Sequence, residues 1–159
     1  MLLFNFPSSI RARKRACQSN YVMSKIDRLL IAFRKLKWTG LALVTLSGVS
    51  MNLKLYGFRG LYNTIKSRAT SPRTKSDPSL VSQVRYAVDH AAFFCLRRKR
   101  CLEKSAAMVL MLRRLGFPAE LVIGCRRMPF TSHAWVEVGG DVVNDSLEVR
   151  SAYTQLDRF

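Results

Sequence analysis

The chain has 159 residues, of which 48% are hydrophobic, and its formal net charge is +17 at pH 7. This length favours one catalytic domain with some appended structure, and the apolar content excludes an intrinsically disordered protein. The charge is uneven, because residues 1–100 hold 20 Lys and Arg against 3 Asp and Glu, whereas residues 101–159 hold 7 of each kind. We therefore expect a basic N-terminal part and a neutral C-terminal part.

The basic part predicts an acidic partner, such as nucleic acid, anionic lipid, or an acidic protein or peptide. The sequence shows no zinc-finger spacing, no aromatic-basic RNA-binding stretch and no zipper repeat, so we expect no nucleic acid. A solvated basic surface without a partner explains the charge equally well. An apolar run at residues 38–51 is shorter than the roughly 20 residues of a membrane span. It predicts a buried or surface-lying helix and leaves a peripheral membrane contact possible.

The four cysteines, Cys17, Cys95, Cys101 and Cys125, form no Cys-x-x-Cys pair. A structural zinc site is therefore not expected, and the sequence predicts no metal and no cofactor. The first ten residues are apolar before the chain becomes basic, which is the reverse of a signal peptide. We expect reduced thiols and a cytoplasmic location.

Residues 1–22 differ in character from the rest of the chain and are predicted to be a disordered tail or a start-site extension, because Met23 opens a stretch that resembles a natural N-terminus. Residues 23–79 are predicted as a basic helical region with a linker. Helices are expected over 25–37, 38–48 and 52–67, the last interrupted by Gly57 and Gly60. Residues 68–79 are rich in Ser, Thr and Pro, which predicts a long loop.

Residues 80–159 show the pattern of a compact α+β domain. A first helix has one apolar face, formed by Leu80, Val84, Ala87, Val88 and Ala91. A second helix is predicted over 101–115, ended by Gly116. Three strands are predicted, over 119–125, 132–138 and 141–145. This order indicates a small antiparallel sheet packed on the helix that begins with Cys101.

Cys101 is the best placed of the cysteines for chemistry. It begins a helix and follows four basic residues. The free N–H groups and the positive end of the dipole at a helix start stabilise a thiolate, which is the reactive form of cysteine. An ordinary half-buried cysteine is the plain alternative.

His133 lies near the start of the strand predicted over 132–138. Strand alternation puts His133, Trp135 and Glu137 on one face. A histidine within reach of a thiol can take its proton and later pass it to a leaving amine. Trp135 could screen the histidine from water or fill the core, which we favour, and Glu137 is expected at the surface. The other histidine, His90, is expected to be a packing or surface residue of a helix.

Asp145 can orient His133 only if the strand register permits. A two-residue turn at Gly139-Gly140 would turn Asp145 away from His133, whereas a three-residue loop starting at Val138 would place the two side by side. We predict the three-residue loop, with a bulge and with Gly140 at positive φ.

These residues resemble those of a known family, the lasso-peptide leader peptidases, in the transglutaminase-like branch of papain-type folds. The stretches that carry the resemblance are Cys101-Leu102, residues 112–124, Pro129-Phe130, residues 133–138 and Asn144-Asp145. The similarity covers about residues 80–159, and the basic helical part before them is similar to the helical N-terminal region of these peptidases.

The resemblance implies a papain/transglutaminase-like core with an N-terminal Cys helix packed on a small antiparallel sheet. It implies Cys101 as nucleophile, His133 as base and acid, and Asp145 as the orienting carboxylate. The implied activity removes the leader from a ribosomally made lasso-peptide precursor. The implied partners are the precursor peptide, a separate leader-binding protein and an ATP-dependent lasso cyclase. Phe130 and Trp135 are candidates for substrate binding, with packing as the alternative for each.

Two other functions fit the same sequence. A transglutaminase would use the same three residues but pass the acyl group to an amine, giving isopeptide products instead of two fragments. A non-catalytic basic module would bind nucleic acid or membrane in a salt-dependent way without any cleavage.

Overall fold

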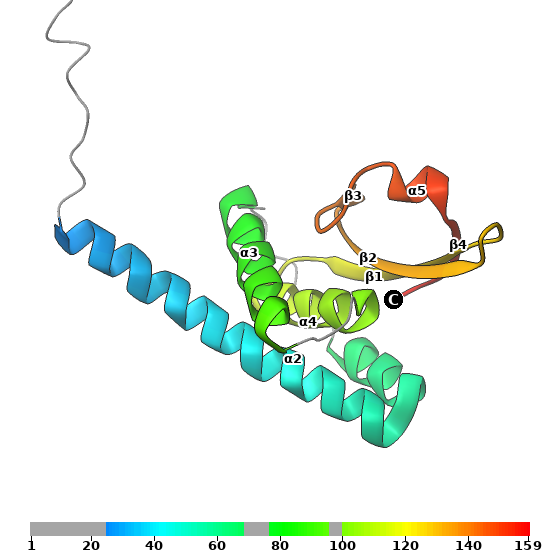
Figure 1. The fold of residues 1–159 in the computed structure, drawn as a ribbon, viewed down its shortest axis with the longest axis horizontal. Helices are drawn as coiled ribbons and strands as arrows, with labels where there is room; N and C mark the ends of the chain where they lie inside the picture. The colour runs from blue at the N-terminus through cyan, green and yellow to red at the C-terminus, as the bar shows by residue number, and fades with distance from the viewer. Residues whose placement is uncertain (1–24, 69–76, 96–99) are drawn as a thin grey trace, which may run out of the picture. The chain divides into compact units, whose positions relative to one another are not determined.

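A computed structural model describes residues 25–68, 77–95 and 100–159 (Figure 1). By their contacts the residues divide into two compact units, Met1–Phe33 and Arg34–Phe159. Of the first unit, residues 25–33 are described and are helical. The sheet and all the candidate site residues belong to the second unit. The tail predicted at residues 1–22, together with Cys17, lies outside the described residues.

Helix α2 (Lys25–Ser67) joins segments that the sequence predicts as three separate helices. Its single non-helical residue is Gly57, with φ 63° and ψ −164°, a conformation that glycine adopts without steric cost. The predicted break near residue 50 was wrong, because the segment contains no proline and one of its faces is held in the core. The core-facing residues of this stretch are Ala42, Thr45, Leu46 and Val49. No helix in the described part of the chain has the length and apolar content needed to cross a membrane.

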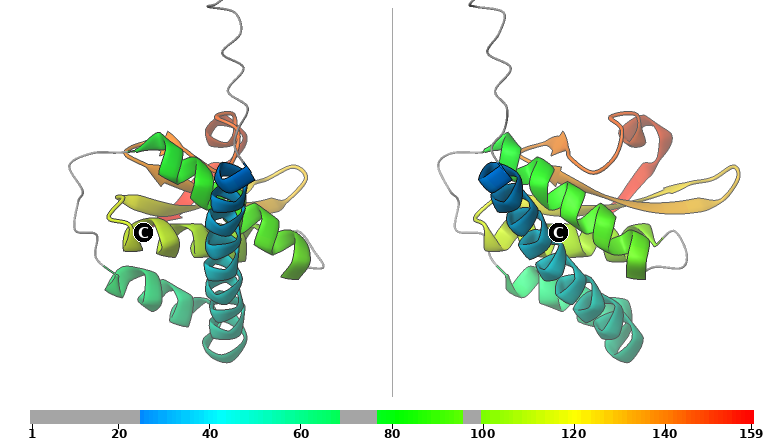
Figure 2. Two further views of the ribbon diagram at one scale, coloured as in Figure 1. Left: turned by 90° about the vertical axis from the view of Figure 1, so that its left-hand side faces the viewer. Right: turned by 60° about the vertical axis from the view of Figure 1, so that its left-hand side comes forward.

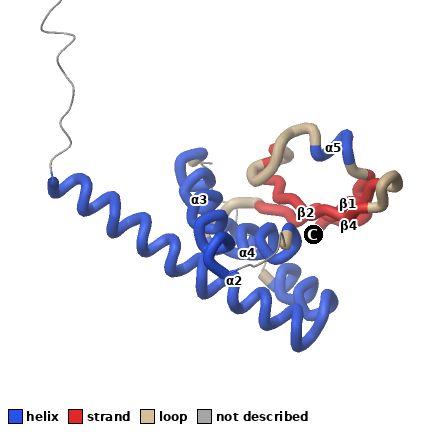
Figure 3. Tube along the Cα trace, in the orientation of Figure 1, coloured by secondary structure: helices blue, strands red, loops and turns tan. Residues whose placement is uncertain are grey.

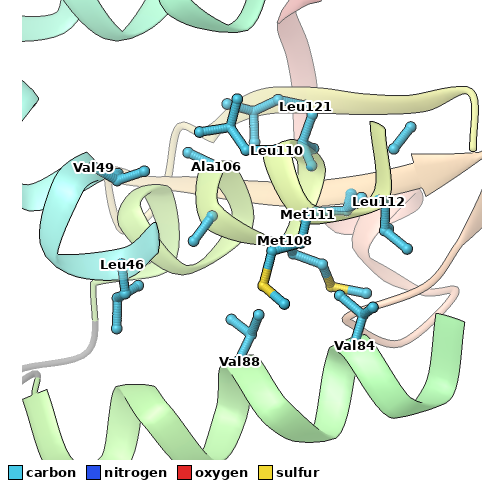
Figure 4. Packing of buried hydrophobic residues seen from close by; sticks show 14 of the residues in the cluster. Leu46, Val49, Val84, Val88, Ala106, Met108, Leu110, Met111, Leu112 and Leu121 are labelled. Carbon is cyan, nitrogen blue, oxygen red and sulfur yellow. The ribbon is translucent and has the colours of Figure 1, made fainter. Parts of the chain in front are cut away.

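Helices α2, α3 (Pro78–Cys95) and α4 (Cys101–Arg114) share one core with the sheet. Helix α3 packs across α4 (Figure 2). Val84 and Val88 of α3 point towards Met108 and Met111 of α4 (Figure 4). Burying a side chain of this size contributes about 1.5–3 kcal/mol. The core therefore includes residues of α2 as well as residues of α3, α4 and the sheet.

The described residues form a four-stranded antiparallel sheet in the order β3-β2-β1-β4. The strands are β1 (Ala119–Arg126), β2 (Thr131–Val138), β3 (Asp141–Val142) and β4 (Thr154–Arg158). Helix α4 lies against one face, and the short helix α5 (Val149–Ala152) lies over the other (Figure 3). The predicted α+β class, with a cysteine helix on a small antiparallel sheet, is confirmed.

Strand alternation in β2 divides its side chains as predicted. Ala134 and Val136 join the core under α4, whereas Trp135 packs with Val122 and Val149 on the opposite face. Strand β4 was not predicted, because all five of its residues are exposed and it carries no apolar alternation. Its place at the sheet edge comes from backbone pairing with β1.

The turn between β2 and β3 differs from the predicted three-residue loop. Val138 pairs with Asp141, which leaves Gly139 and Gly140 as a two-residue turn. Both glycines have positive φ, 59° and 92°, as a tight hairpin turn with the twist of the flanking strands requires. The predicted register was therefore wrong, although the prediction of positive φ at Gly140 was correct.

Candidate active site

Cys101 is the first residue of α4 and is half-buried. The residue before it, Arg100, makes no side-chain cap, so the helix start has N–H groups free of a capping side chain. A hydrogen bond with His133 lowers the pKa of the Cys101 thiol. Burial opposes this shift, and backbone hydrogen bonds from Ala134 and Leu102 add to it. The position at the helix start, predicted from the sequence, is confirmed.

His133 projects from the first half of β2 towards both Cys101 and Asp145. Its Nε2 lies 2.6 Å from Oδ2 of Asp145, which leaves Nδ1 for the thiol. The hydrogen bond with Cys101 raises the pKa of the imidazole, and Asp145 raises it further, whereas burial lowers it. The shifts of the thiol and the imidazole have opposite directions, as expected when a thiolate and an imidazolium stabilise each other.

Asp145 reaches His133 even though the predicted register was wrong. Strand β3 ends at Val142, so Asp145 lies on irregular chain and does not obey strand alternation. Burial would raise the pKa of its carboxyl, but the hydrogen bonds from His133 and from the Ser146 N–H lower it, helped by the charges of His133 and Lys104. The carboxylate is thus kept ionised beside the imidazole.

Asn144 and Ser105 connect the three elements that carry these side chains, and neither role was predicted from the sequence. Asn144 Oδ1 accepts a hydrogen bond from Val136 N–H of β2 at 2.8 Å, and its Nδ2 donates to Ser105 Oγ of α4 at 2.9 Å. Ser105 Oγ in turn donates to the carbonyl of Ala134 at 2.8 Å. This circuit links the helix of Cys101, the strand of His133 and the loop of Asp145. The one signal in the sequence was spacing, since Ser105 lies one helical turn after Cys101 and Asn144 precedes Asp145.

Removing the Ser105 hydroxyl should therefore lower the rate of catalysis by more than the loss of stability alone explains. In Ser105→Ala the buried Ala134 carbonyl and the Asn144 amide each lose a partner, a cost of about 1–3 kcal/mol in the free energy of unfolding. Thr45→Val is a matched control, because Thr45 is also a buried hydroxyl bonded to a backbone carbonyl, but in α2. We expect both variants to melt earlier and only Ser105→Ala to lose cleavage rate at a temperature where both are folded.

The expectation that Glu137 is a surface residue was wrong. Its side chain is 1% exposed and accepts hydrogen bonds from Trp135 Nε1 and Arg150 Nε, both at 2.9 Å. Arg158 of β4 lies 2.9 Å from its other oxygen. Burial would raise the pKa of the carboxyl, but these donors and charges lower it. Glu137 can be buried because Arg150 and Arg158, which are distant in sequence, pair with its carboxylate. No local sequence pattern predicts this pairing.

The remaining candidate residues are spread over different parts of the fold. Trp135 is 1% exposed and packs behind His133, with ring centroids 6.4 Å apart, so its surface is in the core and not open to substrate. Phe130 is 79% exposed in the connection between β1 and β2. Tyr153, which was not among the predicted site residues, packs on His133 with its ring centroid 5.3 Å from that of the imidazole. His90 is exposed and stacks with Tyr86, as expected for a helix-surface residue.

In the ranges that the structure describes, no group of three His, Cys, Asp or Glu side chains is arranged to hold a metal ion. Cys95, Cys101 and Cys125 are free thiols. A surface hollow of about 450 Å³ is lined by α3 and the β2–β3 turn, including Val81, Arg85 and Val143, but by none of Cys101, His133 and Asp145. The chemistry that the arrangement offers is that of an activated thiol with a proton carrier.

This arrangement agrees with the comparisons between the chain and known proteins. The profile of the transglutaminase-like superfamily matches residues 43–158, which is most of the chain, and the chain belongs to this superfamily. The chain is also similar to the microcin J25-processing protein McjB of Escherichia coli, with 50% identity over 50 residues. That match spans 31% of this chain and 24% of the relative. It supports the resemblance to lasso-peptide leader peptidases. No solved structure gives a significant match.

Proposed function

We propose that the chain is a cysteine peptidase that removes the leader from a lasso-peptide precursor. The observation that supports this most is the grouping of Cys101, His133 and Asp145, three side chains supplied by three separate elements, in which His133 Nε2 lies 2.6 Å from Asp145 Oδ2 and the interaction with His133 lowers the pKa of the Cys101 thiol. A thiol alone is a common core residue, but a thiol with a lowered pKa, a histidine with a raised pKa and an orienting carboxylate form the constellation of a nucleophilic hydrolase.

The reaction follows from the protonation states of these groups. The Cys101 thiolate attacks the scissile carbonyl carbon, and the backbone N–H groups at the start of α4 stabilise the oxyanion that forms. The His133 imidazolium gives its proton to the leaving amine as the C–N bond breaks, which leaves the leader as a thioester on Cys101. Neutral His133 then takes a proton from water, whose oxygen attacks the thioester. The thiolate departs, and the leader is released as a carboxylic acid.

The proposed substrate is a ribosomally made lasso-peptide precursor. The relative's name says that it processes microcin J25, and we extend a processing role to this chain. We further propose that a separate leader-binding protein presents the precursor, and that an ATP-dependent cyclase uses the freed amine. Phe130, exposed on the connection from β1 to β2, is a candidate contact for the peptide. We propose a cytoplasmic location for these steps, because a ribosomally made precursor is produced there.

The direct test combines the purified chain with candidate precursor peptides and leader-binding proteins and measures the products by mass spectrometry. We expect two fragments whose masses sum to that of the precursor plus one water. Iodoacetamide should stop the reaction and label Cys101. Precursor that stays whole with every leader-binding protein tried would count against the peptidase.

The pH dependence of the thiol tests the ion pair itself. A free thiol ionises near pH 8.5, and the lowered pKa of Cys101 should move its alkylation by iodoacetamide to lower pH. The raised pKa of His133 should keep the imidazolium present above its ordinary range near 6.5, so cleavage should be greatest between the two transitions. In His133→Gln the alkylation profile should shift upwards. Identical profiles in both proteins would mean that no ion pair exists.

Acyl transfer to an amine is the second candidate function, and the match to the transglutaminase-like superfamily supports it. The thioester would be the same, with a lysine amine replacing water as the acceptor. Supplying a small primary amine during cleavage distinguishes the two, because a transferase gives the amide adduct of the leader as the main product.

A further inference from the structure

The face of α2 that is turned away from the core is apolar. Four large apolar residues with Gly48 between them recur at spacings of three and four, which places them on one side of the helix. These residues are Leu41, Val44, Met51 and Leu55, and their side chains are 38%, 72%, 62% and 62% exposed. We call them the outer stripe. The opposite side of the helix is already buried in the core, so the stripe is a second apolar face without a partner in the chain's own core.

The charge around the outer stripe has one sign. Residues 34–68 contain seven Lys and Arg and no Asp or Glu. Lys37 continues the stripe one turn before Leu41, and Arg34 and Lys54 lie beside it by helical spacing. None of the ion pairs formed among the described residues includes Arg34, Lys37, Lys54 or Arg59. These cations are therefore available to an anionic surface.

We propose that the outer stripe and its flanking cations bind an anionic lipid surface. The aliphatic side chains enter the boundary between headgroups and acyl chains, while the lysine and arginine side chains extend to the phosphates. Juxtamembrane cations act additively, and each contributes about a five-fold gain in binding near an anionic leaflet. The binding is peripheral, because α2 keeps its other face in the protein core.

Other occupants fit the same surface less well. Nucleic acid would use the cations but has no place for a row of aliphatic side chains. A second copy would bring two chains of net charge +17 together. Cores of protein interfaces are enriched in aromatic residues and depleted of lysine, whereas the outer stripe contains no aromatic residue. Four of the seven cations are lysines, Lys35, Lys37, Lys54 and Lys66. An acidic protein partner remains an outcome that the test distinguishes.

The test is co-sedimentation of the full chain with vesicles of phosphatidylcholine, with and without phosphatidylglycerol. We expect binding only to the anionic vesicles and a steep loss with added salt, because the screening length falls from about 10 Å at 0.1 M to about 3 Å at 1 M. The variant Val44→Ser/Met51→Ser/Leu55→Ser and the variant Lys37→Glu/Lys54→Glu should each bind at least about ten-fold more weakly. Their melting temperatures should stay close to that of the wild type, because all five side chains are exposed.

Matched controls lie elsewhere on the surface. Leu156→Ser removes an exposed apolar residue from β4, and Arg114→Glu/Arg127→Glu changes the net charge by the same amount as the α2 variant. Controls that weaken binding as much as the α2 variants would overturn the proposal. The proposal would also be overturned if the chain did not bind anionic vesicles, and this includes the result that it binds DNA or an acidic peptide but no vesicles. Cleavage without vesicles should be unchanged in the α2 variants, so this proposal and the peptidase can fail independently.

Discussion

Cys101→Ala is expected to abolish precursor cleavage while leaving the fold unchanged. Loss of the nucleophile in a triad hydrolase lowers kcat by about six orders of magnitude, which takes the reaction below detection. The substitution removes one sulfur atom from a half-buried helix start, and alanine favours the helix. The measurement is the mass of the products after long incubation with precursor and its leader-binding protein.

Cys95→Ala is the matched control, since Cys95 is a free, exposed thiol at the end of α3 and takes no part in the proposed chemistry. It should cleave at the wild-type rate. If Cys101→Ala retained measurable cleavage that Cys95→Ala lacked, the nucleophile would have been assigned to the wrong residue. A thermal melt of both variants separates loss of chemistry from loss of fold.

Asp145→Asn should lower kcat by about 10²–10⁴, since a triad that loses its carboxylate charge retains its shape but no longer stabilises the imidazolium or selects its tautomer. The carboxylate helps to raise the pKa of His133, so removing it should lower that pKa and make the thiolate–imidazolium pair less stable. We expect the upper pH limit of cleavage to move down, with little change in KM. Initial rates across pH at several precursor concentrations measure both.

Asp141→Asn makes the same chemical change four residues earlier, at an exposed position next to the Gly139-Gly140 turn. Its rate and pH profile should match the wild type. Equal losses of cleavage rate in the two variants would show that the rate depends on the net charge of this region. The specific role of Asp145 in orienting His133 would then be wrong.

Much of the fold follows from patterns that are local in the sequence. The helix that begins at Cys101 and ends before Gly116, the apolar face of α3 and the alternation in β2 all reflect periodic burial, and the structure has each of them. The candidate site residues Cys101, His133 and Asp145 could also be named from the sequence. The contact between His133 and Asp145 was also expected, but from the wrong register, because the true path of the chain to Asp145 depends on how the elements pack.

The features that were not predicted correctly depend on contacts that leave no local pattern in the sequence. Glu137 is buried because it pairs with Arg150 and Arg158, which lie 13 and 21 residues later in the sequence. Pairing between residues so far apart leaves no periodic pattern in the sequence. Strand β4 pairs through its backbone and shows no apolar alternation. The register of β3 was predicted wrongly because the strand was expected to continue to residue 145. In such a strand only a three-residue loop would bring Asp145 beside His133.

The early end of β3 has a consequence for engineering. In a regular hairpin, inserting or deleting one turn residue would rotate every later side chain to the other face of the sheet. Here the segment carrying Asp145 is anchored to α4 and β2 by the Asn144 amide, beyond the last paired residue, Val142. Grafts that lengthen the Gly139-Gly140 tip should therefore leave Asp145 beside His133, which makes this tip a candidate insertion site for tags or affinity loops.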